Sequence, residues 1–179
     1  MWTVNAERER TLYPRVIEAL ADLPVQVIAS APEGAFHGAP DHWITRTRVP
    51  QLQLLARVDA VFCHGGHNTT VEALAYGLPM IIAPIRDDQP VIAEQVKAVG
   101  AGIRVHFSRA KPARLRAAVE AALYEPHYRN AARAVRAEFM GERFMSSPRA
   151  LDQRPVKLAS ALGATRGAEV IESLLSSLS

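Results

Sequence analysis

The stretch from residue 60 to residue 77 constrains this chain most, because it combines the signals of a buried strand, a glycine turn and a helix. An apolar run at 60–62 precedes Gly65 and Gly66, and apolar residues then recur at helical spacing until Gly77. The backbone N–H groups at the start of such a helix point out of its end, where the helix dipole adds positive charge. The pattern therefore predicts a cradle for an anion such as a diphosphate.

The side chains around this turn suit an anion as well. His64 offers an imidazole at the carboxyl end of the strand, while Thr69 and Thr70 offer hydroxyl donors. The two glycines have no Cβ and would let phosphate oxygens approach the main chain. An alternative needs no ligand, because Thr69 and Glu72 fit the S/T-x-x-E capping box that satisfies helix N–H groups internally. Both interpretations remain open on this stretch alone.

Strand and helix patterns alternate along most of the chain, which predicts an α/β fold with a doubly wound parallel sheet. The run at 80–83 is apolar throughout, as in strands buried on both faces. We expect strands at 25–29, 43–45, 60–63, 80–83 and 103–105. We expect helices near 14–23, 52–55, 69–76, 90–99, 113–123, 126–139 and 167–178, with an irregular segment at about 141–165.

Composition excludes several classes of protein. At 179 residues, 49% apolar and 22% charged, the chain fits one globular domain. It has no apolar run near the about 20 residues that span a membrane, and no basic-then-apolar secretory signal. The single Cys63 excludes an internal disulfide and suits the reducing cytoplasm. The net charge is +3, but the basic residues alternate with acids and aromatics are only 6%, so we expect no nucleic-acid partner.

Several separated motifs together resemble a known family. They are His64-Gly65-Gly66-His67-Asn68-Thr69-Thr70-Val71-Glu72-Ala73-Leu74, Gly77-Leu78-Pro79, Pro84 and Asp88-Gln89, with Val49-Pro50-Gln51 upstream and Gly100-Ala101-Gly102 downstream. In order and spacing they resemble the nucleotide-sugar signature of family 1 (GT-B) glycosyltransferases of the bacterial macrolide and antibiotic type, from about residue 3 to residue 139. Such enzymes have two Rossmann-like domains facing each other across a cleft. This chain resembles only the C-terminal, donor-binding domain, so residues 1–179 are expected to form that single domain.

The resemblance assigns residues to the diphosphate and the ribose. His64 and Thr69 match positions that contact the donor's phosphates, and Gly66 and Asn68 match the phosphate-binding turn. Glu72 matches the acid that accepts hydrogen bonds from the ribose hydroxyls, a role that competes with the capping box.

The resemblance also assigns residues to the sugar and the base. Asp88 and Gln89 match the pair that holds the hydroxyls of the transferred sugar, although Asp87 and Asp88 could simply shape the turn before the helix at Pro90. Val49 and Gln51 match positions near the nucleobase. Arg48 stands where plant relatives place a tryptophan that stacks on uracil, and its guanidinium could stack as well. Uracil and thymine both remain possible.

The resemblance implies that the domain binds a UDP- or TDP-sugar for transfer to an acceptor hydroxyl, without a cofactor or metal. The acceptor, a small molecule, and the catalytic base would belong to a missing or separate N-terminal domain, so no catalytic residue is assigned here. One alternative is a truncated, non-catalytic module that binds a nucleotide or pairs with another chain. A second is the donor domain of the lipid-linked GlcNAc transferase of cell-wall synthesis. A zinc site at Cys63, His64 and His67 lacks an evident fourth ligand.

The sequence departs from the family at its start. Relatives begin this domain with a strand and a Gly-Thr turn just before the position of residues 3–5, where this chain has Met1 and Trp2. In a sheet of order 3-2-1-4-5-6 the first strand is central, so its absence would leave a gap between the strands at 25–29 and 60–63. We therefore expect the isolated chain to be marginally stable, or to receive that strand from elsewhere.

Overall fold

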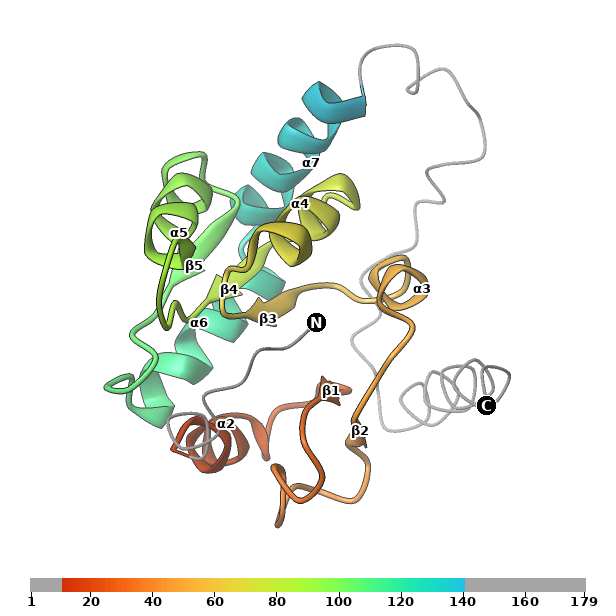
Figure 1. The fold of residues 1–179 in the computed structure, drawn as a ribbon, viewed down its shortest axis with the longest axis vertical. Coiled ribbons are helices and arrows are strands. Elements are labelled where there is room, and N and C mark those ends of the chain that lie inside the picture. The colour runs from red at the N-terminus through yellow and green to blue at the C-terminus, as the bar shows by residue number, and fades with distance from the viewer. Residues whose placement is uncertain (1–10, 141–179) are drawn as a thin grey trace. The chain divides into compact units, whose positions relative to one another are not determined.

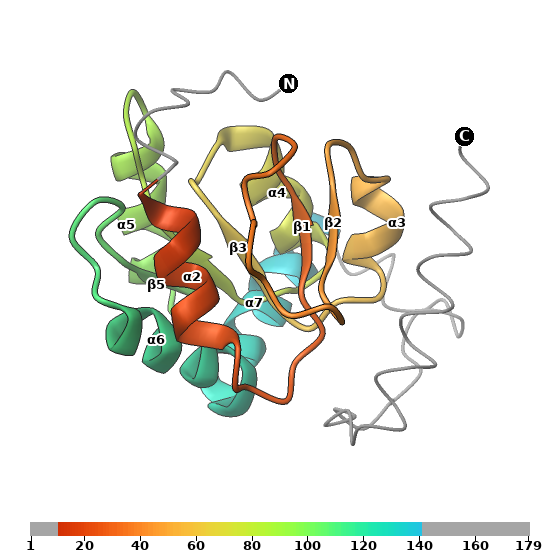
Figure 2. The same ribbon diagram turned by 90° about the horizontal axis from the view of Figure 1, so that it is seen from below.

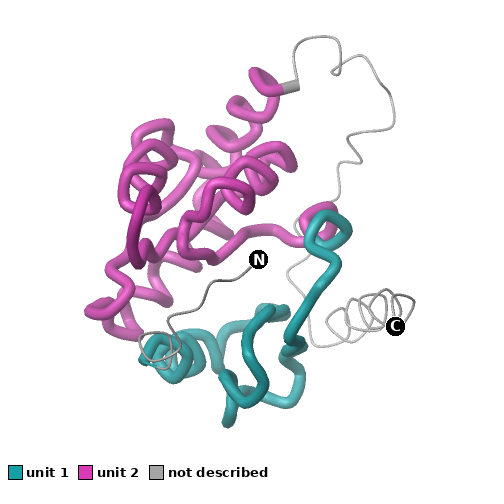
Figure 3. Tube along the Cα trace, viewed as in Figure 1, with its two compact units in different colours: residues 1–54, 154–179 teal, residues 55–153 magenta. Residues whose placement is uncertain are grey.

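The computed structural model describes residues 11–140. The chain divides into two compact units, which Figure 3 distinguishes by colour. The first comprises residues 1–54 and 154–179, and the second residues 55–153. Each unit is described by itself. The irregular segment expected at 141–165 and the helix expected at 167–178 lie outside the described residues.

The first unit contains two helices and a two-stranded parallel sheet. They are α2 (Leu12–Leu20), β1 (Ile28–Ser30), β2 (Ile44–Arg46) and α3 (Gln51–Leu55). Helix α2 begins at Leu12, so Pro14 stands in the first turn, where its missing N–H is no loss. Ile28 of β1 pairs with Ile44 of β2. A small core of Ile44 and Leu54 forms beneath them.

The strand predicted at 25–29 is shorter and later than expected. Its ladder begins at Ile28, although the carbonyl oxygen of Val27 already accepts a hydrogen bond from the backbone N–H of Ile44 in β2 at 2.9 Å. The amide of Gln26 donates to the carbonyl oxygen of His42 at 2.6 Å and to that of Val27 at 3.2 Å.

The second unit is a three-stranded parallel sheet in the order β3-β4-β5 with four helices, seen in two directions in Figures 1 and 2. Its elements are β3 (Val61–Cys63), α4 (His67–Ala75), β4 (Met80–Ile82), α5 (Gln89–Ala98), β5 (Gly102–Arg104), α6 (Pro112–Tyr124) and α7 (Pro126–Met140). The central strand β4 is fully buried, as its apolar sequence predicts. It joins α4, α5 and α7 in one core that includes Ala73, Ala93 and Ala132.

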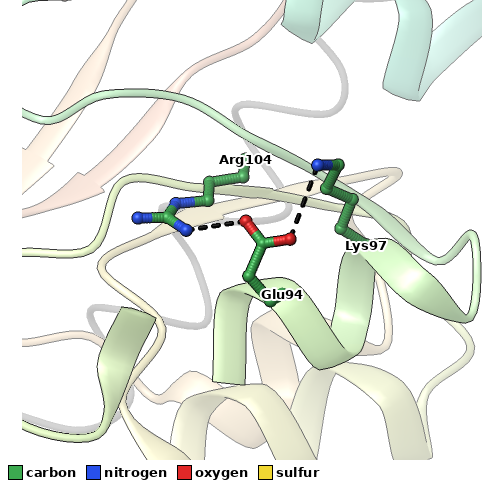
Figure 4. A network of polar contacts seen from close by, with 3 residues as sticks. All are labelled: Glu94, Lys97 and Arg104. Atoms are coloured by element: carbon green, nitrogen blue, oxygen red, sulfur yellow. Dashed lines mark hydrogen bonds and ion pairs between the residues drawn. The ribbon is translucent and has the colours of Figure 1, made fainter. Parts of the chain in front are cut away.

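Polar contacts fix two of these helices to the sheet region. Helix α5 packs on β5, and Glu94 accepts a hydrogen bond from Arg104 Nη1 at 2.6 Å and one from Lys97 Nζ at 3.4 Å (Figure 4). Helix α7 packs on α4 and α6, and Arg129 Nη2 donates to the carbonyl oxygen of Asp59, just before β3, at 3.1 Å. These ties hold the first residues of β3 and the body of α5 in place.

The strands fall into two separate sheets. Within residues 11–140 no ladder joins β1 to β3, the two strands between which the sequence predicts a gap. All three residues of β3 are half-buried, in contrast to the fully buried β4. That a further strand fills this position stays a prediction. Within the same range, no helix is long and apolar enough to cross a membrane.

Candidate functional site

The register of the sheet brings two loops to one edge. Cys63, the last residue of β3, pairs with Ile82, the last residue of β4. The turn after β3 and the loop after β4 therefore both leave from the carboxyl edge, where α/β sheets bind ligands. A Cβ on Gly65 would lie 2.7 Å from Ile82 Cγ2 and 3.5 Å from the carbonyl oxygen of Gln89. The turn thus packs directly against the end of β4 and the start of α5.

The first turn of α4 carries no side-chain cap. Gly66 is the N-cap residue, with φ −62° and ψ 142°, and the first helical hydrogen bond runs from Thr70 N to Gly66 O at 3.0 Å. The capping box predicted as the alternative is wrong, because Thr69 is the third residue of the helix and not its cap. The N–H groups of residues 67–69 precede the first helical hydrogen bond, so they remain for an anion.

His64 lies over this turn. A Cβ on Gly66 would come within 2.8 Å of His64 Nε2, so only glycine leaves the imidazole in this place. Burial lowers the pKa of His64, Arg86 lowers it further, and Asp88 opposes the change. Because the ordinary value is 6.5, the free site holds a neutral imidazole at pH 7. His64 and the loop after β4 are therefore close enough to interact electrostatically.

The remaining predicted residues of α4 differ in access. Asn68 is exposed, Thr69 is half-buried, and Glu72 is half-buried further along the helix. Thr70 is only 4% exposed, and its Oγ1 is buried without a hydrogen-bond partner among the described residues. Of the two hydroxyls that the sequence offers, Thr69 is the one that keeps access to solvent.

The loop after β4 presents Asp88 and buries Gln89. Asp88 precedes α5 as its N-cap residue, yet its side chain makes no capping hydrogen bond. Gln89 is 9% exposed, and its Oε1 accepts hydrogen bonds from the backbone N–H groups of Ile85, at 2.9 Å, and Arg86, at 3.2 Å. The side chain of Gln89 thus holds the loop backbone, whereas the carboxylate of Asp88 takes no part in capping α5.

Arg86 is a charge that the sequence interpretation missed. It forms an ion pair with Asp87, with Nε 3.3 Å from Oδ2, and its charge reaches His64. The available signal was its position two residues before Asp88, in a loop that follows a strand next to β3.

The three residues predicted near the nucleobase lie in the first unit, between β2 and the start of α3. Arg48 is exposed, Val49 is half-buried against the core of Ile44 and Leu54, and Gln51 is the half-buried first residue of α3. The three lie within four consecutive residues of one segment. That they complete one site with His64 stays a prediction.

Cys63, the last residue of β3, is half-buried. Burial raises its pKa from 9.0 to about 11, although the N–H of Gly65 donates to the sulfur and opposes the rise. The thiol is therefore protonated at neutral pH, whereas a metal ligand or nucleophile must be a thiolate. Across residues 11–140, no three His, Cys, Asp or Glu side chains are grouped so as to hold a metal ion.

Sequence and structure are both similar to known proteins. Residues 14–150 match the family described as erythromycin biosynthesis protein CIII-like, C-terminal domain. The chain is 34% identical over 151 residues to the PGL/p-HBAD biosynthesis glycosyltransferase of Mycobacterium tuberculosis, covering 84% of this chain and 35% of that protein. It is 34% identical over 140 residues to 4'-demethylrebeccamycin synthase of Lentzea aerocolonigenes, covering 76% and 32%. The chain thus spans about a third of the length of these relatives.

Among solved structures, the fold is similar to that of the glycosyltransferase VinC in complex with DTDP. The TM-score is 0.68 at 26% sequence identity, and the match covers 92% of this chain and 40% of that chain.

Proposed function

Because the chain belongs to the family of erythromycin biosynthesis protein CIII-like C-terminal domains, we propose that it binds a nucleoside-diphosphate sugar and serves as the donor-binding half of a glycosyltransferase. One observation carries the proposal. The start of α4 has no side-chain cap, and it lies beneath His64 and beside the loop that presents Asp88. Backbone donors, an imidazole and a carboxylate are thus collected at one edge of a parallel sheet.

In this proposal the diphosphate binds at the first turn of α4. The N–H groups of residues 67–69, the hydroxyl of Thr69 and the imidazole of His64 donate to its oxygens, with Gly66 and Asn68 forming the turn. Hydrogen bonds to charged groups contribute about 1.5–3 kcal/mol each. The same donors stabilise the charge that develops on the diphosphate as it leaves the sugar, which is often a major source of catalysis.

The other parts of the donor are assigned to neighbouring residues. Glu72 accepts hydrogen bonds from the ribose hydroxyls, and this role is supported by the loss of its capping alternative. Asp88 and Gln89 hold the transferred sugar. Arg48, Val49 and Gln51 contact the base, which is uracil or thymine. The acceptor hydroxyl and the base that activates it are supplied by another domain or polypeptide.

Calorimetric titration of the chain tests the proposal. We expect UDP or dTDP to bind with equal affinity in the presence and absence of EDTA, because the protein itself supplies every donor to the diphosphate. UDP-glucose, dTDP-glucose and UDP-N-acetylglucosamine, titrated in parallel, separate the antibiotic-type class from the cell-wall alternative. Failure of both nucleotides to bind would refute the proposal.

An acceptor assay then separates an enzyme from a binding module. The chain is incubated with a sugar nucleotide and an aglycone acceptor, with and without an added N-terminal domain of a family member. Transfer only in the presence of that domain is the expected result. Nucleotide binding without transfer in either case would favour the non-catalytic module.

A further inference from the structure

Arg86 is a cation on the loop after β4, and packing fixes its backbone relative to the turn after β3. Its N–H donates to Oε1 of Gln89 at 3.2 Å, and Gln89 is buried. The carbonyl oxygen of Gln89 lies 3.5 Å from the place that a Cβ on Gly65 would take. Gly65 directly precedes Gly66, the N-cap residue of α4. A short series of packed groups therefore connects Arg86 to the start of α4, although the two segments are far apart in the sequence.

The side chain of Arg86 has a partner that it can exchange. Its Nε lies 3.3 Å from Oδ2 of Asp87, and the two side chains are 44% and 71% exposed. An ion pair this exposed contributes little to stability, because water solvates both charges when they separate. A phosphate can take the place of the carboxylate, since the planar guanidinium matches two phosphate oxygens with parallel N–H donors.

The charge of Arg86 acts at the start of α4. Burial is the largest cause of the lowered pKa of His64, Arg86 is the second, and Asp88 opposes both. Two groups that disfavour positive charge on each other are both stabilised when an anion binds near them. The N–H groups of residues 67–69 add positive charge at the same edge of the sheet. A diphosphate bound there is therefore attracted by the loop after β4 as well as by α4.

We propose that Arg86 exchanges Asp87 for the second phosphate of the donor, the one that carries the sugar. This inference rests on the proposed function, in which the start of α4 binds the diphosphate and Asp88 contacts the sugar. Asp88 follows Arg86 by two residues, so the phosphate bonded to the sugar is the nearer of the two to this loop. Arg86 is then the residue by which the chain binds a nucleoside diphosphate more tightly than the monophosphate.

Calorimetry with UDP and UMP, and with dTDP and dTMP, tests this contact. The quantity compared is the ratio of affinity for the diphosphate to affinity for the monophosphate, because it cancels changes in the binding of the base, the ribose and the first phosphate. Arg86→Gln removes the charge and keeps the backbone N–H that donates to Gln89. We expect it to lower the ratio about ten-fold, in the lower part of the range for a hydrogen bond to a charged group.

Arg133→Gln is the matched control for net charge. Arg133 is exposed on α7, and its Cγ lies 3.2 Å from the place that a Cβ on Gly77 would take. Gly77 follows the last turn of α4, at the opposite end of that helix from the proposed diphosphate site. The control variant should keep the wild-type ratio.

Asp87→Asn tests the exchange of partners. Asp87 has φ 55°, a left-handed conformation that asparagine also adopts, so the variant loses the ion pair and keeps the loop. We expect its affinity for UDP to rise about two- to five-fold, because Arg86 no longer has to leave a carboxylate. The same substitution should give a smaller gain in the Arg86→Gln chain, since only a direct repulsion between Asp87 and the phosphates is then removed.

Two results would contradict the inference while leaving the nucleotide site intact. The first is a ratio that Arg86→Gln lowers no more than Arg133→Gln does. The second is an equal gain from Asp87→Asn in both backgrounds, because Asp87 would then act on the phosphates without Arg86. If the wild-type chain binds neither UDP nor dTDP, the proposed function fails, and this inference fails with it.

Discussion

Replacing Gly65 by alanine should destabilise the second unit strongly, because two independent costs coincide at this position. Gly65 has φ +84°, in the left-handed region that costs an L residue about 1–2 kcal/mol. Its new Cβ would lie 2.7 Å from Cγ2 of Ile82, a fully buried residue of the central strand, and overpacking of this kind costs about 1–3 kcal/mol. The lower entropy of the unfolded alanine chain returns about 0.4–1 kcal/mol. We therefore expect Gly65→Ala to lower the free energy of unfolding by about 1–5 kcal/mol.

Gly66→Ala is the matched control, because it makes the same chemical change one residue later. Gly66 has φ −62° and ψ 142°, which alanine adopts without strain. Its Cβ would meet the ring of His64 at 2.8 Å, and that ring is the end of a flexible side chain that can move aside. We expect little loss of stability but weaker binding of UDP, since the imidazole leaves its place.

Urea unfolding followed by circular dichroism, with calorimetry of UDP binding, measures both effects. The reasoning is refuted if Gly65→Ala unfolds at the wild-type urea midpoint, or if Gly66→Ala is the more destabilised of the two.

Further outcomes are expected for His64, Cys63, Glu94 and an upstream strand. His64→Ala should weaken UDP binding by about 1–3 kcal/mol in calorimetry, and unchanged affinity would remove His64 from the site. As pH falls below 6.5, the affinity of the wild-type chain for UDP should rise more than that of His64→Ala. The negative charge of the diphosphate favours the protonated imidazole, which burial and Arg86 disfavour in the free chain. Since burial raises the pKa of Cys63 to about 11, stability from the neutral thiol is complete below pH 9 and is lost between pH 9 and 11. Iodoacetamide should accordingly alkylate the native chain at pH 8 about 100-fold more slowly than the urea-unfolded chain, and equal rates would contradict this. The hydrogen bond from Arg104 lowers the pKa of Glu94, so its stabilising effect is complete above pH 4.5 and declines as pH falls further. Glu94→Gln should therefore shift the urea midpoint slightly at pH 7, and the shift should become smaller as pH falls below 4.5. A strand appended upstream of residue 1 should raise the melting temperature, and an equally high value without it would defeat the expected gap.

The sequence predicts most of the second unit because its elements are set by local signals. The helices expected at 90–99, 113–123 and 126–139 lie within one residue of α5, α6 and α7. Proline at the first or second position of α5 and α6 marks their starts. The first unit is harder, because β1 is set by pairing with β2 some 16 residues later and by a hydrogen bond from Gln26 to the carbonyl oxygen of His42, which no local pattern reveals.

The residue types of the candidate site were predictable from the sequence. Which of them cap the helix and which lie close to one another were not. Thr69 and Glu72 fit a capping box in sequence, yet α4 begins at His67, where Gly66 supplies an extended N-cap conformation without a side chain. The nearness of Arg86 to His64 follows from the pairing of β3 with β4, which a single sequence does not state. A rule that pairs the loops after adjacent parallel strands would have found it.

Burial distinguishes the residues that hold the loops of this site in place from those that are accessible to a ligand. Gly65 and Gln89 are buried and fix the relation between the turn after β3 and the loop after β4, whereas Asn68 and Asp88 are exposed on the same two segments. A substitution at a buried position changes packing and therefore both stability and binding, while one at an exposed position changes binding alone. Measuring both quantities for each variant therefore distinguishes a residue that contacts the sugar nucleotide from one that holds such a residue in place. By this criterion Gln89 is expected to affect stability, since its oxygen accepts hydrogen bonds from the loop backbone, and the exposed Asp88 to affect binding alone.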